Sequence, residues 1–123
     1  MAKYLSPQEY LHMERESPIK HEYLNDKIVA MTGASLAHND IVSNLLTEIG
    51  SFLKGKTCKI TPSNLRLSIP SANTYTYPHA IIICGKPEMV DDNFDTVMNP
   101  AVIFEVLSRS SGQYDSGNKF LFY

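Results

Sequence analysis

The spacing of hydrophobic and polar positions predicts one long amphipathic helix in the first half of the chain. After Ser35, apolar residues recur at 41, 42, 45, 46, 49, 52 and 53, which places them on one continuous stripe of a helix. Gly55 is a natural C-terminal cap, and Lys54 and Lys56 are well placed beside the negative end of the helix dipole. We therefore expect a helix that begins after Ser35 and ends before Gly55.

The N-terminal segment predicts a shorter helix followed by a hairpin. Ser6 and Glu9 have the spacing of a capping box around Pro7, and Ser17-Pro18 should end the helix near Glu16. Residues 21–31 then form two short apolar stretches around an Asn-Asp turn, which is the pattern of a β-hairpin.

The second half of the chain predicts strands. Residues 57–61 lead into residues 65–69, which alternate apolar and polar side chains as a half-exposed strand does. Residues 80–84 and 102–107 are apolar runs that predict two central strands, the second with a glutamate inside it. Residues 85–99 are polar and acidic and predict a loop. Residues 118–123 have the pattern of a helix that has just begun.

Composition adds the class of protein. The chain has 123 residues, of which 43% are hydrophobic and 20% are charged, so it has the composition of a globular domain. This length predicts one domain over residues 1–123. No apolar run approaches the ~18 residues that span a bilayer, and the N-terminus turns polar too early for a signal peptide. Cys58 and Cys84 lie in apolar stretches without metal-ligand spacing, which predicts reduced core thiols in a cytoplasmic protein.

The charges are unevenly distributed. The formal net charge is −2, yet residues 49–87 contain no Asp or Glu. Basic residues within that band predict contacts with nucleic-acid phosphates, and the alternative interpretation is that they only keep the ends of a helix and strands in solvent. The predicted nucleic-acid contacts are Lys54, Lys56, Lys59 and Arg66.

Three residues are candidates for chemistry. Glu105 lies inside a predicted buried strand, where a carboxylate is costly unless it is paired or binds a metal. The alternative is a glutamate that faces outward at the strand end. His79 directly precedes the other predicted central strand, so the two side chains would meet at one sheet edge if the strands are neighbours. The alternative for His79 is a packed or solvated ring. Lys119 could bring an ammonium group to the same place.

Several motifs taken together resemble the Uma-type family of restriction endonucleases within the PD-(D/E)XK nuclease superfamily. They cover nearly the whole chain. The matching stretches are Pro7-x-Glu9-Tyr10-Leu11, Lys20-His21-Glu22-Tyr23-Leu24, Gly33-Ala34-Ser35 with His38-Asn39, Ser63-Asn64-Leu65-Arg66, Tyr77-Pro78-His79, Asn99 to Ser108, and Tyr114-Asp115-x-Gly117-x-Lys119-Phe120.

This resemblance implies a fold and an activity. The fold is of the mixed α/β (α+β) class, a restriction-endonuclease-like mixed sheet flanked by helices, here truncated at its C-terminus. The implied activity is Mg²⁺-dependent hydrolysis of DNA. In that chemistry, two carboxylates bind the metal, the metal activates a water, and a lysine offsets charge. By the resemblance, Glu105 and position 79 hold the metal, Lys119 is the lysine, and Glu22 is a further acidic contributor or a surface residue of the hairpin.

The chain departs from the family pattern where the chemistry is most demanding. His79 stands where the family carries aspartate, and imidazole is a poor ligand for Mg²⁺ although it suits Mn²⁺ or Zn²⁺. Leu107 occupies the superfamily's usual lysine position, and Asn64 stands where the family tends to carry another acid. His38, at the start of the long helix, is expected to be a packing or hydrogen-bonding residue.

Three hypotheses follow from the sequence. The first is an endonuclease domain impaired by His79, with Mg²⁺ or Mn²⁺ as cofactor. The second is a non-catalytic remnant of the same fold that binds nucleic acid or protein through the basic band. The third is a fragment that folds as a homo-oligomer, which covers the apolar segment 120–123.

Overall fold

The computed structural model describes residues 5–31 and 35–106, which form a mixed α+β fold. In chain order the elements are α1 (Pro7–Glu16), β1 (His21–Leu24), β2 (Lys27–Ala30), α2 (Leu36–Leu53), β3 (Cys58–Pro62), β4 (Arg66–Ile69), the 3-10 helix η1 (Pro70–Ala72), β5 (Thr74–Thr76), β6 (Ala80–Cys84), β7 (Thr96–Val97) and β8 (Val102–Phe104). Among these residues no helix is both long enough and apolar enough to cross a membrane.

The N-terminal elements form where the sequence predicts them. The Ser6 side chain accepts a hydrogen bond from the Glu9 backbone N–H, and the Glu9 carboxylate accepts one from the Ser6 N–H, so the predicted capping box is present. The hairpin turns at Asn25 and Asp26, which have φ of 49° and 77°. Two successive positive φ values give the tight turn that matches the twist of paired strands.

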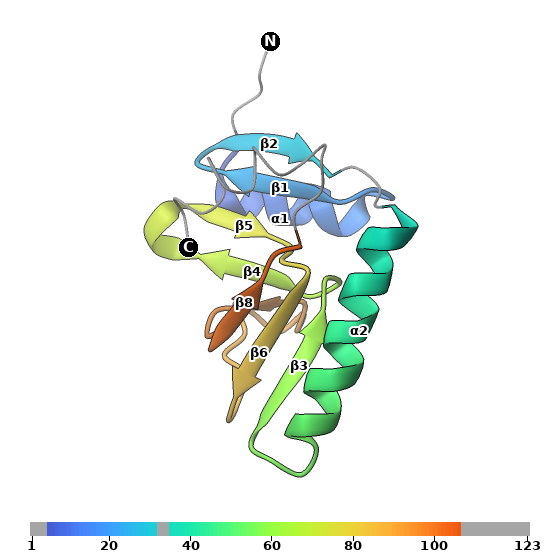
Figure 1. Cartoon of the computed structure of the whole chain (residues 1–123). Helices are drawn as coiled ribbons and strands as arrows, with labels where there is room; N and C mark the ends of the chain where they lie inside the picture. The colour runs from blue at the N-terminus through green and yellow to red at the C-terminus, as the bar shows by residue number, and fades with distance from the viewer. Residues whose placement is uncertain (1–4, 32–34, 107–123) are drawn as a thin grey trace.

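The long helix is confirmed as α2, Leu36–Leu53. Ser35 caps it by accepting a hydrogen bond from the His38 N–H, and Gly55 follows it with φ of +80°. The predicted apolar stripe is buried only in part, because Ile41 and Phe52 are 50% and 71% exposed. Figure 1 shows the helix running alongside β3, so most of its surface faces solvent.

The strands are distributed over two sheets (Figure 1). The larger sheet has the order β2-β1-β5-β4-β7, and β4 and β7 are its parallel pair. The smaller sheet has the order β3-β6-β8, and both of its pairs are antiparallel. Helix α1 packs on the larger sheet around Tyr10 and Tyr23, whereas Leu67, Ile81, Ile83 and Val97 form a second core between the two sheets.

Two strand predictions need correction. The strand predicted as central over residues 102–107 is β8, which ends at Phe104 and lies at the edge of the three-stranded sheet in the described chain. Its apolar sequence is explained by packing, because Ile103 contacts the core between the sheets. The segment 85–99, predicted to be a loop, contains β7, and β5 was not predicted because it has only three residues.

The prediction of reduced, buried cysteines is wrong for this structure. Cys58 and Cys84 lie directly opposite each other on β3 and β6, and a disulfide joins them. Cys58 is the first residue of β3 and Cys84 is the last residue of β6, and Cys84 is exposed. Strand pairing between residues 26 positions apart creates this pair, and a linear sequence does not reveal the register.

Candidate active site

Strand pairing places positions 79 and 105 side by side. β6 and β8 run antiparallel with Ala80 opposite Phe104, so the residue before β6 and the residue after β8 are neighbours. His79 Nδ1 lies 3.1 Å from Glu105 Oε2. The structure therefore brings together the two side chains that the sequence singled out.

The Glu105 carboxylate is enclosed by protein. Its side chain is only 1% exposed, whereas that of His79 is 18% exposed. An outward-facing glutamate at the strand end is therefore not what the structure contains. Enclosing a carboxylate costs several kcal/mol unless polar groups compensate it, so the groups around Glu105 define the site.

The ring of His79 is fixed by the backbone that follows Glu105. The Val106 N–H donates a hydrogen bond to His79 Nδ1 over 2.8 Å. A backbone amide can only donate, so Nδ1 acts as the acceptor and the neutral ring carries its proton on Nε2. In that tautomer Nδ1 has no proton to give to Glu105, so the 3.1 Å approach joins two acceptor atoms and is neither a hydrogen bond nor an ion pair.

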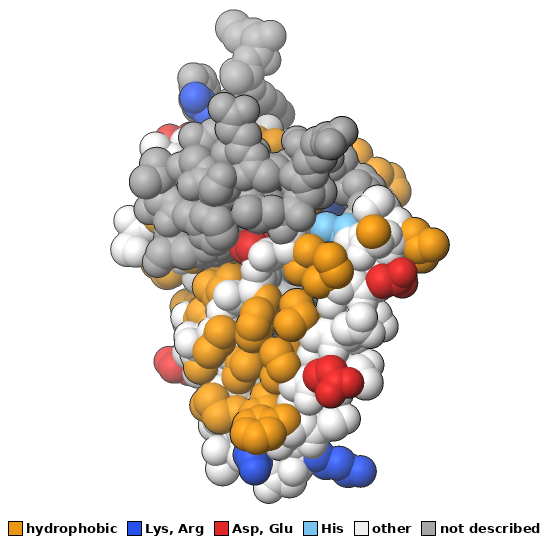
Figure 2. Space-filling model, in the orientation of Figure 1, with side chains coloured by type: hydrophobic (Ala, Val, Ile, Leu, Met, Phe, Trp, Pro, Cys, Tyr) orange, Lys and Arg blue, Asp and Glu red, His pale blue; other side chains and the backbone are white. Residues whose placement is uncertain are grey.

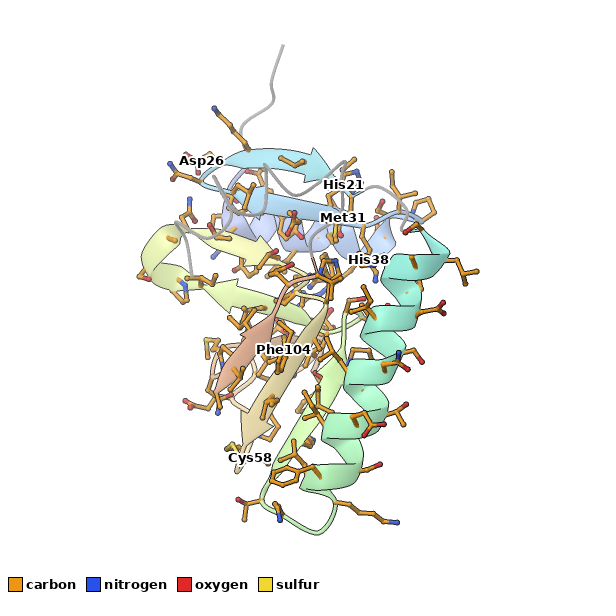
Figure 3. All side chains as sticks on the ribbon, viewed as in Figure 1. His21, Asp26, Met31, His38, Cys58 and Phe104 are labelled. Atoms are coloured by element: carbon orange, nitrogen blue, oxygen red, sulfur yellow. A yellow bond between two sulfur atoms is a disulfide. The ribbon has the colours of Figure 1, made fainter. Side chains whose placement is uncertain are left out.

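A second histidine reaches the same residue from α2. His38 is 8% exposed, and its Nε2 lies 2.9 Å from the Val106 carbonyl oxygen, to which it donates. The rings of His38 and His79 meet edge to face, with centroids 4.4 Å apart. Figure 3 shows His38 at the start of α2, beside the end of β8. The expectation of a hydrogen-bonding residue at position 38 is confirmed.

The described donor set does not fit Mg²⁺. This ion prefers oxygen ligands in an octahedral arrangement, and the pair at the strand ends offers one carboxylate and one imidazole whose Nδ1 already accepts from Val106. Within residues 5–31 and 35–106 no three His, Cys, Asp or Glu side chains come together as a metal-binding group. We therefore derive no chemical step through a metal.

The other candidates at this site have different outcomes. Glu22 is 3% exposed on β1 and accepts a hydrogen bond from Thr76, so the interpretation as a surface residue of the hairpin is wrong. The register of β1 and β5 explains this contact, because Tyr23 pairs with Tyr75 and places position 22 beside position 76. Lys119 lies outside the described residues, as does the apolar segment 120–123.

Arg66 does not belong with the predicted nucleic-acid contacts. Its side chain is 6% exposed, and it donates hydrogen bonds to Tyr77 Oη at 3.0 Å and Thr96 Oγ1 at 2.8 Å. Burial raises the pKa of Tyr77 to about 12, so its hydroxyl keeps its proton and donates to Glu14 Oε2 at 2.8 Å. Arg66 is thus part of an internal network that ties α1 to β4, and no periodic signal in the sequence predicts that network.

Lys54, Lys56 and Lys59 are exposed, but they lie far from His79 and Glu105 at the strand ends. They follow the C-terminal end of α2, whereas His38 is near the start of this 18-residue helix. At about 1.5 Å per residue, the two ends of α2 are about 25 Å apart. In Figure 3 His38 and Cys58 lie toward opposite ends of α2, and Figure 2 shows basic side chains at the lower end.

Comparison with known proteins assigns the family. Residues 7–123 match the Uma2 family, which is described as "Putative restriction endonuclease". The chain belongs to the Uma2 family. Two uncharacterized proteins of Synechocystis are 34% and 38% identical over 121 and 119 residues, which is 98% and 97% of this chain and 68% and 62% of theirs.

A solved structure shows the same fold. The crystal structure of a "putative nuclease belonging to DUF820" from Anabaena variabilis superimposes with a TM-score of 0.74 at 19% identity, covering 95% of this chain and 66% of that one. The Uma2 chain thus has a restriction-endonuclease-like, mixed α+β fold, and it spans about two thirds of the length of these three proteins.

Proposed function

We propose that this Uma2 chain is a DNA endonuclease domain in which phosphodiester hydrolysis is strongly impaired at His79. The observation that carries the proposal is the 3.1 Å contact between His79 and the buried Glu105 at paired strand ends. A buried carboxylate at this position is where a nuclease of this fold would need its acid. An imidazole beside it replaces the second carboxylate that the family resemblance leads us to expect.

The physical reason for impairment is the loss of negative charge. Two carboxylates attract a divalent cation much more strongly than one carboxylate and a neutral ring, because Mg²⁺ binding is dominated by charged oxygen ligands. His79 has the further handicap that its Nδ1 accepts from the Val106 amide. The proposed cofactor is Mg²⁺, as the family resemblance implies, or Mn²⁺ for the wild-type chain. Lys119 is the proposed cationic group. The proposed location of the protein is the cytoplasm.

The test is nicking of supercoiled plasmid DNA with Mg²⁺ or Mn²⁺. We expect wild-type protein to give little or no nicking and His79→Asp to give clear nicking with Mg²⁺. Adding Glu105→Gln to His79→Asp should abolish that nicking, whereas adding Glu88→Gln, which alters a carboxylate on the acidic segment after β6, should leave it unchanged.

Two results would contradict this proposal. Efficient nicking by wild-type protein that disappears in Glu105→Gln would show that the site is not impaired. No nicking by His79→Asp with either metal, in protein that remains folded, would remove the support for an ancestral catalytic site.

A second candidate function rests on the exposed lysines at the far end of α2. Lys54, Lys56 and Lys59 are all exposed, and Lys56 lies over the Phe52 ring at 4.9 Å. Such a surface would bind DNA phosphates without any contribution from His79 or Glu105. Binding should then survive Glu105→Gln and should weaken as salt rises.

Neutralising the three lysines to Gln tests this candidate. The slope of log K against log salt should become shallower by about 0.9 for each phosphate that the variant no longer neutralises, whereas Lys27→Gln, an exposed control on β2, should not change it. An equal decrease of binding in the control, or no binding at low salt, would count against a specific basic surface.

A further inference from the structure

The backbone of Val106 is held at both of its polar groups by histidines from different elements. Its N–H donates to His79 Nδ1 over 2.8 Å, and its carbonyl accepts from His38 Nε2 over 2.9 Å. His79 directly precedes β6, His38 belongs to the first turn of α2, and Val106 follows β8 by two residues. Three elements distant in sequence therefore meet at one residue.

The two contacts define complementary roles for the rings. His79 must present an unprotonated Nδ1 to the amide, and His38 must present a protonated Nε2 to the carbonyl. Both requirements are met by the same neutral tautomer, with the ring proton on Nε2. The side chain of His79 is 18% exposed and the whole of residue His38 is 8% exposed, so water competes weakly for these bonds.

We call the two hydrogen bonds between the Val106 backbone and the rings of His38 and His79 the clamp. The clamp holds the residue next to Glu105. β8 ends at Phe104, so strand pairing no longer fixes the backbone at Glu105 and Val106. Holding both polar groups of the Val106 backbone fixes the direction in which the chain leaves the sheet, and with it the direction of the Glu105 side chain. The Glu105 carboxylate lies 3.1 Å from Nδ1 of the same His79 ring.

We propose that His38 and His79 are a pair of positioning residues that clamp Val106 and thereby aim the Glu105 carboxylate. In this role His79 is committed through Nδ1 to the backbone and is not a metal ligand through that atom. That Glu105 is the reacting carboxylate rests on the proposed function, but the clamp itself does not. Its hydrogen bonds require neither metal nor DNA.

Nitrogen-15 NMR of the wild-type protein tests the clamp directly. Long-range ring spectra should show His38 and His79 both as neutral rings protonated on Nε2, with Nδ1 of His79 acting as an acceptor. The Val106 amide should be shifted downfield and protected from hydrogen exchange. A proton on Nδ1 of His79 would overturn the proposal, because it would show a ring that donates to Glu105 instead of accepting from Val106.

Substitutions that keep or remove one hydrogen bond separate clamping from packing. His79→Asn retains an acceptor near the place of Nδ1, and His38→Gln retains a donor near the place of Nε2. Both should keep the Val106 amide at least partly protected, whereas His79→Leu and His38→Leu should increase its exchange rate by about tenfold or more. Amides of β4 serve as the reference for folding, and equal changes there and at Val106 in all four variants would overturn the proposal.

Kinetics separate this inference from the proposed function. If His79→Asp nicks DNA, that background lacks the His79 ring and tests only the His38 half of the clamp. Adding His38→Gln should then leave kcat within about threefold, while adding His38→Leu should lower kcat by about tenfold or more at similar KM, as expected for a misaligned group. If His79→Asp is inactive, the proposed function fails while the NMR results still decide the clamp. Nicking in a protein whose Val106 amide is unprotected would overturn the clamp alone.

Discussion

At the scale of single residues, polar side chains that look like surface charge in the sequence join separate elements of the fold. Arg15 on α1 donates hydrogen bonds to Asp95 at 2.8 and 2.9 Å, and Arg66 from β4 lies 3.5 Å from the same carboxylate. The hydrogen bond from Arg15 holds the pKa of Asp95 down at about 2. One carboxylate thus fixes the segment before β7 against α1.

Asp95 predicts a defined loss of stability in acid. Its pKa is lower in the folded than in the unfolded chain, so its contribution is present above about pH 4 and disappears as pH falls toward 2. Allowing for partial exposure, Asp95→Asn should lower the free energy of unfolding at pH 7 by about 1 to 2 kcal/mol and flatten the loss of stability between pH 4 and 2. Urea denaturation across this range measures both effects.

Asp92→Asn is the matched control, because it changes an exposed carboxylate in the same loop. Its acid profile should follow that of the wild type. An Asp95→Asn protein with an unchanged pH profile would show that the ion pairs with Arg15 and Arg66 contribute nothing to folding.

Substitution by Met should lower stability at Arg66 and leave it nearly unchanged at Lys59. Arg66→Met removes two buried hydrogen bonds and leaves Tyr77 and Thr96 without those donors, so stability should fall by about 1 to 3 kcal/mol, with no change in the salt dependence of any DNA binding. Lys59→Met, at an exposed position, should leave stability nearly unchanged. Thermal denaturation and DNA titration measure the two quantities, and a fall in the salt slope for Arg66→Met would contradict its interior role.

At the scale of elements, local signals in the sequence located the helices better than the strand partners. Ser6, Pro7 and Glu9 determine the start of α1 through contacts within one turn. No such local signal exists for β8, whose place at the edge of the smaller sheet, among the described residues, depends on pairing with β6. Its apolar residues predicted a strand correctly and its position in the sheet incorrectly.

The Cys58–Cys84 bridge joins β3 to β6 and should stabilise this pair of strands. Replacing both cysteines by alanine should lower the free energy of unfolding by about 3 kcal/mol, given a loop of about this length. Thiol titration of denatured, unreduced protein should find no reactive thiol. Two titratable thiols per chain, or unchanged stability of the double variant, would contradict a structural bridge.

At the scale of the whole molecule, the two cores are linked through β4. β4 contributes Leu67 to the core between the sheets, and it pairs with β5, whose Tyr75 packs against the core around Tyr10 and Tyr23. This shared strand is the physical basis for expecting residues 5–31 and 35–106 to unfold as one unit.

Leu67→Ala tests that coupling. Leu67 is fully buried, so its truncation should cost about 2 to 5 kcal/mol. The unfolding midpoint should shift by the same amount for both probes of unfolding. One probe is the near-ultraviolet signal of the tyrosine cluster, and the other is amide exchange of Ile81 and Ile83. Two separate midpoints would show that the cores unfold independently.

The sequence by itself determined the features that depend on short-range patterns. These are the two helices and their caps, the hairpin turn and the apolar strand 80–84, since periodicity and capping act within a few residues of the chain. The mixed fold class was implied by the family resemblance, and the pairing of His79 with Glu105 depended on whether their two strands are neighbours. Tertiary structure alone decided which of these segments pair, and therefore which polar side chains are enclosed. Arg66 became an interior donor, Glu22 a buried acceptor and Val106 the meeting point of two histidines because strand register, together with the packing of α2 beside β6, brings residues 27 to 68 positions apart into hydrogen-bond contact.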